Sequence, residues 1–215
     1  MDVLTTRAEF LDVNCYAVRA EGHSDCILVD AGFDAAPGLA EVLAEEGLTP
    51  QAIFLTHGHP DHILGLPGML ERWDVPVHLG ADDHYRMAAP GETLGPAFAQ
   101  MIAPLLTDWQ APAEVVPLTD GTAVTVAGLT VTAVAAPGHT EGSTLLRVSA
   151  DGEEVVFTGD VVFAGAIGRI DLPGGDAEAM GSTLRAFADL PDVPIYPGHG
   201  PGSRVGHELR TNPFL

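Results

Sequence analysis

The chain contains no lysine. Its nine basic residues are all arginines, against 30 aspartates and glutamates, so the formal net charge at pH 7 is −21. Proteins that bind nucleic acid neutralise phosphates with clustered lysines and arginines. The composition therefore argues against a nucleic-acid partner, and it means that an anionic small molecule would be repelled at long range.

No hydrophobic run reaches the ~18 residues that a membrane-spanning helix needs. The first residues, Met1 to Arg7, show no basic region followed by an apolar stretch, which is the pattern of a secretory signal. The sequence therefore predicts a cytoplasmic protein without a membrane partner.

Cysteine is also scarce. Cys15 and Cys26 each lie within an apolar run that predicts a strand. A disulfide between them is one option, but a reducing compartment favours two buried free thiols. Neither cysteine is expected to act as a nucleophile or a metal ligand, because neither lies in a loop rich in glycine, histidine and aspartate.

A chain of 215 residues, 46% of them hydrophobic, suits one domain with a sizeable core. Neither a repeat nor a linker divides it, so a single domain over residues 1–215 is predicted. Apolar periodicity predicts strands at 11–20, 25–30, 53–56, 75–79, 115–118, 123–126, 129–135, 145–149, 154–158 and 193–196. Helices are predicted at 38–46, 62–72 and 177–190, with Gly47 as a stop and Asp176 as an N-cap.

Prolines interrupt the helical pattern of residues 81–112. We expect a pair of short helices there, with loops that cover one side of a functional site. The mixture of strands and helices along the chain indicates an α/β or an α+β fold, and periodicity does not separate the two.

Histidine and aspartate are concentrated in one stretch, Thr56-His57-Gly58-His59-Pro60-Asp61-His62. It follows an apolar run that predicts a buried strand and precedes a predicted helix. A loop fixed between two such elements can hold several ligands with little freedom left to lose. Imidazole and carboxylate groups in this pattern suit a transition metal. A polar surface turn with chance histidines is the alternative.

Three later segments repeat the same context. His139, Asp160 and His199 each follow a short apolar run and lie beside a glycine, which lets the backbone turn tightly. Ligands gathered from the ends of several strands are a common way to build a site on a rigid scaffold.

These segments together resemble the signature of the metallo-β-lactamase superfamily, H-x-H-x-D-H followed by distant histidine, aspartate and histidine. The resemblance runs from about Asn14 to the C-terminus. It implies an α+β fold, the αββα four-layer sandwich. The stretch from Gly168 to Asp176 and the ending from Glu208 to Phe214 are similar to the single-domain glyoxalase-II-like hydrolases.

Carried over residue by residue, the resemblance implies two metal positions. The ligands would be His57, His59 and His139 for the first, Asp61, His62 and His199 for the second, and Asp160 as a bridge. It implies two divalent ions, with zinc favoured and iron or manganese as alternatives. Such a pair lowers the pKa of a bound water toward ~7. Asp61 is also expected to act in catalysis, by orienting the nucleophile.

The function that the resemblance implies is hydrolysis of a small-molecule thioester of the hydroxyacyl-thiol type. No extra proton-donor motif is present, and a thiolate, whose conjugate thiol has a pKa near ~8.5, leaves without one. The alternatives are a mononuclear iron oxygenase resembling persulfide dioxygenases, a lactonase or β-lactamase, and a non-catalytic metal-stabilised scaffold. The thiol carrier, the native metal and the oligomeric state stay open.

Arg169 follows a glycine-containing loop soon after Asp160, and two interpretations fit it. Its guanidinium can clamp a substrate carboxylate, or it can form an ion pair with Asp171. Asp30, at the end of a predicted strand, is expected to support the metal loop or form its turn. The isolated histidines are interpreted as surface or packing residues, and they are His23, His78, His84 and His207.

Overall fold

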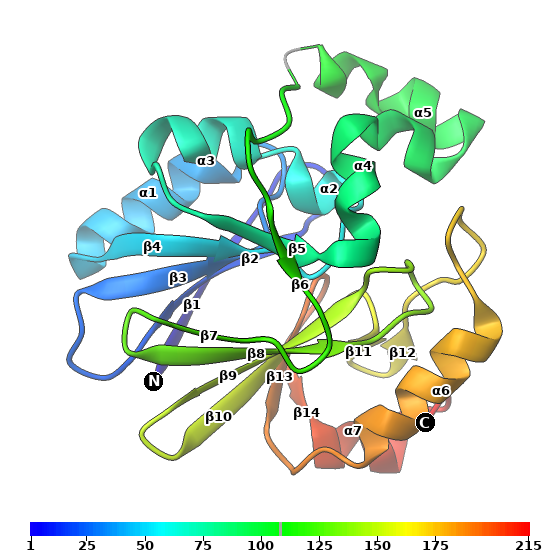
Figure 1. Ribbon diagram of the computed structural model, residues 1–215. Helices are drawn as coiled ribbons and strands as arrows, with labels where there is room; N and C mark the ends of the chain where they lie inside the picture. The colour runs from blue at the N-terminus through cyan, green and yellow to red at the C-terminus, as the bar shows by residue number, and fades with distance from the viewer. Residues whose placement is uncertain (108) are drawn as a thin grey trace.

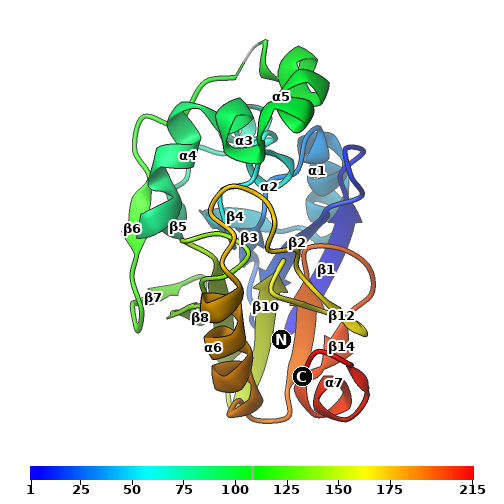
Figure 2. The ribbon, with the colours of Figure 1, turned by 90° about the vertical axis from the view of Figure 1, so that its right-hand side faces the viewer.

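The computed structural model describes residues 1–107 and 109–215, with the backbone alone described at residue 97. Two six-stranded sheets face each other, and helices cover the outer face of each (Figures 1 and 2). The first sheet contains, in spatial order, β1 (Asp2–Arg7), β2 (Asn14–Arg19), β3 (Asp25–Val29), β4 (Thr49–Phe54), β5 (Val77–Gly80) and β6 (Val116–Leu118). The second contains β14 (Ser203–Arg204), β13 (Pro194–Pro197), β10 (Glu153–Gly159), β9 (Thr144–Ala150), β8 (Leu129–Ala135) and β7 (Ala123–Val126).

The helices on the side of the first sheet are α1 (Ala35–Glu46), α2 (Pro60–Ile63) and α3 (Leu66–Arg72). Those beside the second sheet are α6 (Ala177–Ala188) and α7 (Val205–Thr211). Residues 81–106 form α4 (His84–Ala88), α5 (Pro96–Ile102) and the 3-10 helices η1 (Ala81–Asp83), η2 (Pro90–Leu94) and η3 (Ala103–Leu106). A short ribbon of β11 (Val162–Phe163) and β12 (Ala166–Ile167) follows the second sheet's central strand β10.

Alternation of side chains along the buried strands creates the layers, because successive residues of a strand point to opposite faces. On β3, Leu28 packs on the side of α1, while Ile27 faces the second sheet. On β10, Phe157 faces the first sheet, while Val156 packs on the side of α6. Apolar cores therefore lie between the sheets and beneath each helical layer, which confirms the predicted αββα sandwich.

The predicted helix over 62–72 is wrong in one respect, because it breaks between Ile63 and Leu66. The N–H of Gly65 donates to the carbonyl of Ala31 at 2.8 Å. A Cβ at position 65 would lie 2.0 Å from the carbonyl oxygen of Gly32. This close approach to the segment after β3 turns the chain and divides the helix in two.

The termini of the longer helices agree with the sequence signals. Asp176 accepts hydrogen bonds from the N–H groups of Glu178 and Ala179 and so caps α6. Gly47 ends α1 with a φ of 64°, a left-handed conformation that glycine adopts at little cost. Strand β1 and helix α7 were not predicted, since both are only partly buried and their apolar patterns are weak.

Both cysteines are buried and free, as predicted. The register of β2 and β3 pairs Tyr16 with Val29 and Val18 with Ile27, so the two thiols lie several residues apart along the strands. Burial raises the pKa of each thiol to about 12. Both therefore stay protonated and unreactive at neutral pH.

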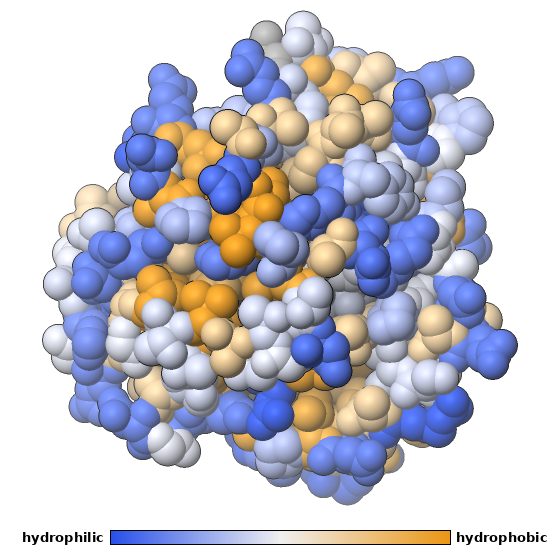
Figure 3. Space-filling view, viewed as in Figure 1, coloured by the Kyte–Doolittle hydropathy of each residue, from blue (hydrophilic) through white to orange (hydrophobic). Residues whose placement is uncertain are grey.

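None of the helices in the described part of the chain is long and apolar enough to cross a membrane. On the face seen in Figure 3, hydrophilic side chains dominate the rim, and hydrophobic ones show toward the middle.

Candidate metal centre

The seven predicted ligands follow the carboxyl ends of four strands. His57 to His62 come after β4, His139 after β8, Asp160 after β10 and His199 after β13. Strands β8, β10 and β13 run in the same direction, because β9 is antiparallel to both β8 and β10, and β13 is parallel to β10. The ligand loops therefore gather at one edge of the sandwich, on a rigid base.

The side chains converge in three overlapping groups, within each of which nitrogen or oxygen atoms lie within 4.8 Å of one another. These groups are His57, His59 and His139; His57, His62 and Asp160; and Asp61, His62 and His199. We call the first of these the first cluster and the last of them the second cluster. The structure thus brings together all seven residues that the sequence predicted.

Asp160 lies between the two clusters. Its carboxylate oxygens are 3.6 Å from Nε2 of His139, 3.4 Å from Nε2 of His62 and 3.5 Å from Nε2 of His199. Asp61 belongs to the second cluster, with Oδ2 3.3 Å from Nε2 of His199. A bridging position for Asp160 is compatible with these distances.

The outer ring nitrogens of three histidines are fixed by oxygen acceptors. His62 Nδ1 donates to Asp30 at 2.9 Å, His139 Nδ1 to the carbonyl of Arg169 at 2.8 Å, and His199 Nδ1 to the carbonyl of Leu11 at 3.0 Å. In each case Nε2 is left to face the centre of the site. Hydrogen bonds of this kind fix the tautomer and orientation of metal-binding histidines.

Asp30 supports the site as predicted. It takes a left-handed conformation at the end of β3, with a φ of 60°. Its carboxylate accepts hydrogen bonds from His62 and from both the N–H and the hydroxyl of Thr56. Since the single hydroxyl proton of Thr56 goes to Asp30, its oxygen is free to accept from Nδ1 of His57, 3.2 Å away.

The two clusters differ in charge. Burial and the neighbouring His62 hold the pKa of His57 well below its usual value, and burial with His139 lowers the pKa of His59 to about 3. In the second cluster burial acts in the same direction, but carboxylates outweigh it. Asp30 and Asp160 hold the pKa of His62 well above its usual value, and Asp160 and Asp61 raise the pKa of His199 to about 9.

The donor set fits a pair of divalent ions. Nε2 of His57, Nε2 of His62 and Oδ1 of Asp160 are buried without a hydrogen-bond partner among the described residues. Buried polar atoms without partners are costly, and here they face a shared centre. Neutral imidazoles and carboxylates are suitable ligands for zinc, iron or manganese.

The side chain of Arg169 forms an ion pair with Asp171, which is one of the two interpretations that the sequence allowed. Its Nε and Nη2 donate to Asp171 at 2.7 and 2.8 Å, and the guanidinium lies 5.5 Å from the ring centroid of Phe98 on α5. The side chain is 48% exposed. The backbone carbonyl of Arg169 reaches the site, through His139, while its side chain lies at the rim.

Sequence reasoning missed the supports of the His199 loop. Asn14 Nδ2 donates to the carbonyls of Pro197 and Gly200, and the hydroxyl of Tyr16 donates to Pro197 at 2.6 Å. Both side chains are buried on β2, far from the loop in sequence. Their types and spacing carry no signal of this role.

It also missed Asp83, a fully buried carboxylate on η1 that binds the loops of the first cluster. The sequence shows two adjacent aspartates there, Asp82 and Asp83. Nothing in their pattern indicates that one is exposed and the other enclosed.

The isolated histidines are packing or surface residues, as interpreted. The ring of His78 stacks on Phe54, with centroids 4.5 Å apart. Nε2 of His84 contacts the carbonyl of Leu79. Neither belongs to the groups that could hold a metal ion.

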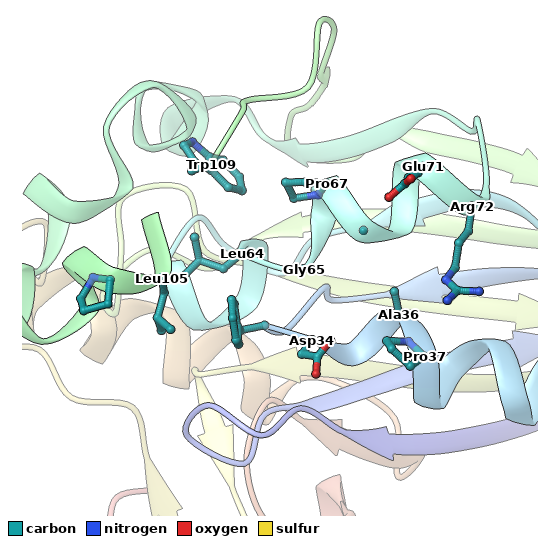
Figure 4. A pocket seen from close by; sticks show the side chains of 13 residues that line it. Asp34, Ala36, Pro37, Leu64, Gly65, Pro67, Glu71, Arg72, Leu105 and Trp109 are labelled. Atoms are coloured by element: carbon teal, nitrogen blue, oxygen red, sulfur yellow. The ribbon is translucent and has the colours of Figure 1, made fainter. Parts of the chain in front are cut away.

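A separate cavity of about 360 Å³ lies between α1, α3, η3 and Trp109 (Figure 4). Leu64, Leu105 and Trp109 give it apolar walls, and Asp34 and Arg72 lie at its lining. None of the seven predicted ligands lines this cavity, so it is distinct from the metal centre.

Comparison with known proteins yields a match over most of the chain. The model of the metallo-beta-lactamase superfamily matches residues 8–199. An uncharacterised protein of Mycobacterium tuberculosis is 36% identical over 217 residues, which covers 97% of this chain and 95% of that protein. The hydroxyacylglutathione hydrolase GloC of Haemophilus influenzae is 31% identical, with 94% and 92% covered.

Among solved structures, TTHA1623 in a di-iron-bound form is similar over 99% of this chain and 100% of that one. The TM-score is 0.81 and the sequence identity 31%. A likeness of this extent includes both sheets and the segments that carry the seven residues.

Proposed function

Because this chain belongs to the metallo-beta-lactamase superfamily, we propose that it is a dinuclear metal-dependent hydrolase whose substrate is a hydroxyacyl thioester of a small-molecule thiol. The observation that carries the proposal is the convergence of seven histidine and aspartate side chains at one edge of the sandwich. Likeness to GloC supports the thioester class, and the di-iron-bound neighbour supports two ions.

In this proposal the first cluster holds one ion, the second cluster holds the other, and Asp160 contacts both. Divalent ions there would supply an activated water and polarise an acyl oxygen. Asp61, whose side chain is 11% exposed, would accept a hydrogen bond from the attacking water and so orient it. We favour zinc, with iron and manganese as alternatives.

A thioester suits the site because its leaving group needs no proton donor. Thiols have a pKa near ~8.5, so a thiolate departs readily at neutral pH, whereas an amine must be protonated as it leaves. The histidines of both clusters are committed to ligation in this proposal. They are therefore not available as general acids for a lactam.

Arg169 is proposed to bind a carboxylate of the substrate. Its guanidinium is half exposed at the rim, next to the loop that orients His139. An exposed ion pair such as that with Asp171 is weak because solvent screens it, so a substrate carboxylate can compete for the same guanidinium. We also propose a cytoplasmic location, which suits the two protonated, buried thiols.

The test is metal analysis combined with a substrate panel. The purified protein should bind about two divalent ions per chain and hydrolyse a hydroxyacyl thioester faster than a lactone or a β-lactam. One tightly held iron together with oxygen uptake on a persulfide would instead favour the oxygenase. Two bound ions with preferred lactone hydrolysis would keep the dinuclear centre and replace the substrate class.

A further inference from the structure

Asp83 is an enclosed carboxylate behind the first cluster, and it is 0% exposed. Four donors saturate it. Oδ2 accepts from the N–H of Gly58 at 2.7 Å and from the hydroxyl of Thr140 at 2.8 Å. Oδ1 accepts from the N–H of Gly142 at 2.9 Å and from Nε of Arg86 at 3.0 Å.

Three of these donors, Gly58, Thr140 and Gly142, come from the two loops that carry the first cluster, and Arg86 is on α4. Gly58 lies between His57 and His59, and Thr140 directly follows His139. One oxygen atom of Asp83 therefore holds both loops at once. Charge-assisted hydrogen bonds of this length are among the stronger ones in proteins, and they are strongest when buried.

His59 depends on this link more than the other histidines do. Its Nδ1 lies 2.8 Å from Nε2 of His139, inside the cluster. Its Nε2 is buried with no hydrogen-bond partner among the described residues. Because no acceptor within residues 1–107 and 109–215 fixes the outer side of its ring, its position follows from the backbone that Asp83 holds through Gly58.

Arg86 extends the link to a third segment. Its side chain is fully buried, and Nη2 donates to the carboxylate of Glu141 and, at 3.2 Å, to the carbonyl of Pro173. Burial alone would lower the pKa of Arg86, but Asp83 and Glu141 raise it, so the guanidinium stays charged. A buried charge with several partners fixes the groups around it, because breaking one contact leaves the charge uncompensated.

Glycines let the three loops approach this pair. A Cβ at Gly58 would lie 2.9 Å from Cδ of Arg86, and one at Gly142 would lie 2.4 Å from the backbone nitrogen of Asp83. At Gly174, where φ is 91°, a Cβ would lie 2.2 Å from Nη2 of Arg86. The glycine inside the metal-binding motif is thus explained by its contact with this pair.

We infer that Asp83 and Arg86 are positioning residues for the first metal position, because they set the separation of His59 and His139 through the loops on either side. The inference rests on the proposed metal centre. It adds that two residues that are not ligands hold the ligands of the first position in place. We call the two residues the Asp83–Arg86 hub.

The hub should act on one metal position and spare the other. The second cluster is held by separate groups, namely Asp30 for His62 and the carbonyl of Leu11 for His199. Neither of these contacts the hub's carboxylate or guanidinium. A change at Asp83 should therefore weaken binding of one ion only.

The experiment is a titration of metal-free protein with cobalt(II), followed by absorbance and by competition with a chelator. Wild type should bind two cobalt ions per chain. Asp83→Asn keeps the shape of the side chain but replaces one acceptor with a donor. It should lower one of the two affinities by ~10–100-fold, the range for groups that support ligands, and should change the spectrum of the three-histidine site.

Glu208→Gln is the matched control. Glu208 is also 0% exposed, and its carboxylate accepts from the N–H of Gly165 and from Nδ2 of Asn212. The variant removes a buried carboxylate of the same kind away from the two clusters. It should lower thermal stability to a similar degree and leave both cobalt affinities unchanged.

Thr140→Val is the second variant, for the case in which Asp83→Asn does not fold. It removes one donor to Asp83 and keeps the carboxylate. It should weaken the same single affinity to a smaller degree. If Asp83→Asn leaves both affinities unchanged, or if all three variants lower both in step with stability, the inference is wrong. A wild type that binds no cobalt would overturn the proposed function itself, and the inference with it.

Discussion

In the first cluster the pKa values of His57 and His59 are lowered, whereas the second cluster combines two histidines of raised pKa with a carboxylate. The loops of the first cluster are linked by hydrogen bonds to one carboxylate, that of Asp83. Rings of the second are each oriented by an acceptor of their own, Asp30 or the carbonyl of Leu11. His57 and His139 of the first cluster also donate to acceptors of their own, so the two positions differ chiefly in how His59 is held.

The difference determines which substitutions should weaken metal binding at each position. Backbone hydrogen bonds to a shared carboxylate place His59 indirectly, so a distant substitution can move it. Ring hydrogen bonds act on His62 and His199 directly, so each depends on a different neighbour. Asp160, which approaches histidines of both clusters, is the element that the two positions share.

Asp160→Ala should have the largest effect, because it removes what the clusters share. It deletes the carboxylate that lies 3.4 to 3.6 Å from His62, His139 and His199. Turnover should fall by at least ~100-fold and both ions should bind more weakly, as expected when the surroundings of a metal are removed. Hydrolysis assays with metal analysis check this, and near-normal turnover would contradict the bridging assignment.

Asp30→Asn should weaken the second position more than the first, because His62 donates to Asp30 directly, whereas His57 is linked to it only through Thr56. Asparagine tolerates the left-handed backbone at this residue, but it places an amide where His62 and Thr56 now donate to a carboxylate. The more affected cobalt affinity should fall by ~10–100-fold, and it should be the one that Asp83→Asn leaves intact.

Asp34→Asn is the control for this change. Asp34 has a similar φ of 58° but is exposed and makes no side-chain cap hydrogen bond. It should leave both affinities unaltered. If Asp30→Asn and Asp83→Asn reduce the same affinity, the two positions do not have separate supports, and the comparison fails.

Sequence patterns predicted most strands and the longer helices because their causes are local, whereas the arrangement in four layers was implied by the family resemblance. Strand alternation and the helix termini at Gly47 and Asp176 can be interpreted without knowing the fold. The break at Gly65 could not be predicted, since its cause is the carbonyl of Gly32, which a helical pattern does not reveal. Similarly, β1 is half exposed, and its apolar signal is weak.

The ligands were predicted because histidine and aspartate beside glycine at strand ends form a dense pattern. The groups that orient them were not, apart from Asp30. Leu11 and Arg169 contribute carbonyl oxygens, which any residue possesses. Asp83 contributes a side chain, but its partners lie 25 and 57 residues away in sequence. The prediction that residues 1–215 form a single domain stays a prediction.

Arg169→Ala should have a moderate effect that concerns the substrate and not the metal. If the guanidinium binds a substrate carboxylate, the change should raise KM for an anionic thioester and lower kcat less, because such a contact acts on ground and transition states about equally. A neutral thioester should be little affected. Steady-state kinetics with both substrates check this.

The matched variant is Asp171→Asn, which removes the partner that now holds the guanidinium. A substrate clamp predicts an unchanged or lower KM for the anionic thioester in this variant. Equal losses in both variants and for both substrates would assign Arg169 to holding its loop, whose carbonyl orients His139. In that case the side chain of Arg169 would act on the first cluster, by fixing the carbonyl that orients His139.

Tyr16→Phe should have the smallest effect. It tests whether the His199 loop keeps its position when one of its supporting hydrogen bonds is lost. The change removes one buried hydrogen bond to the carbonyl of Pro197, which keeps its bond from Asn14. The free energy of unfolding should fall by ~1 kcal/mol, or ~2–4 °C in Tm for a chain of this size. Because His199 keeps its own bond to Leu11, both cobalt affinities should stay within a few-fold of wild type. Tyr196→Phe is the control, since that ring stacks on Phe157 and its hydroxyl makes no hydrogen bond within the described residues. A selective loss of one ion in Tyr16→Phe alone would mean that the second cluster, like the first, depends on the backbone of its loop.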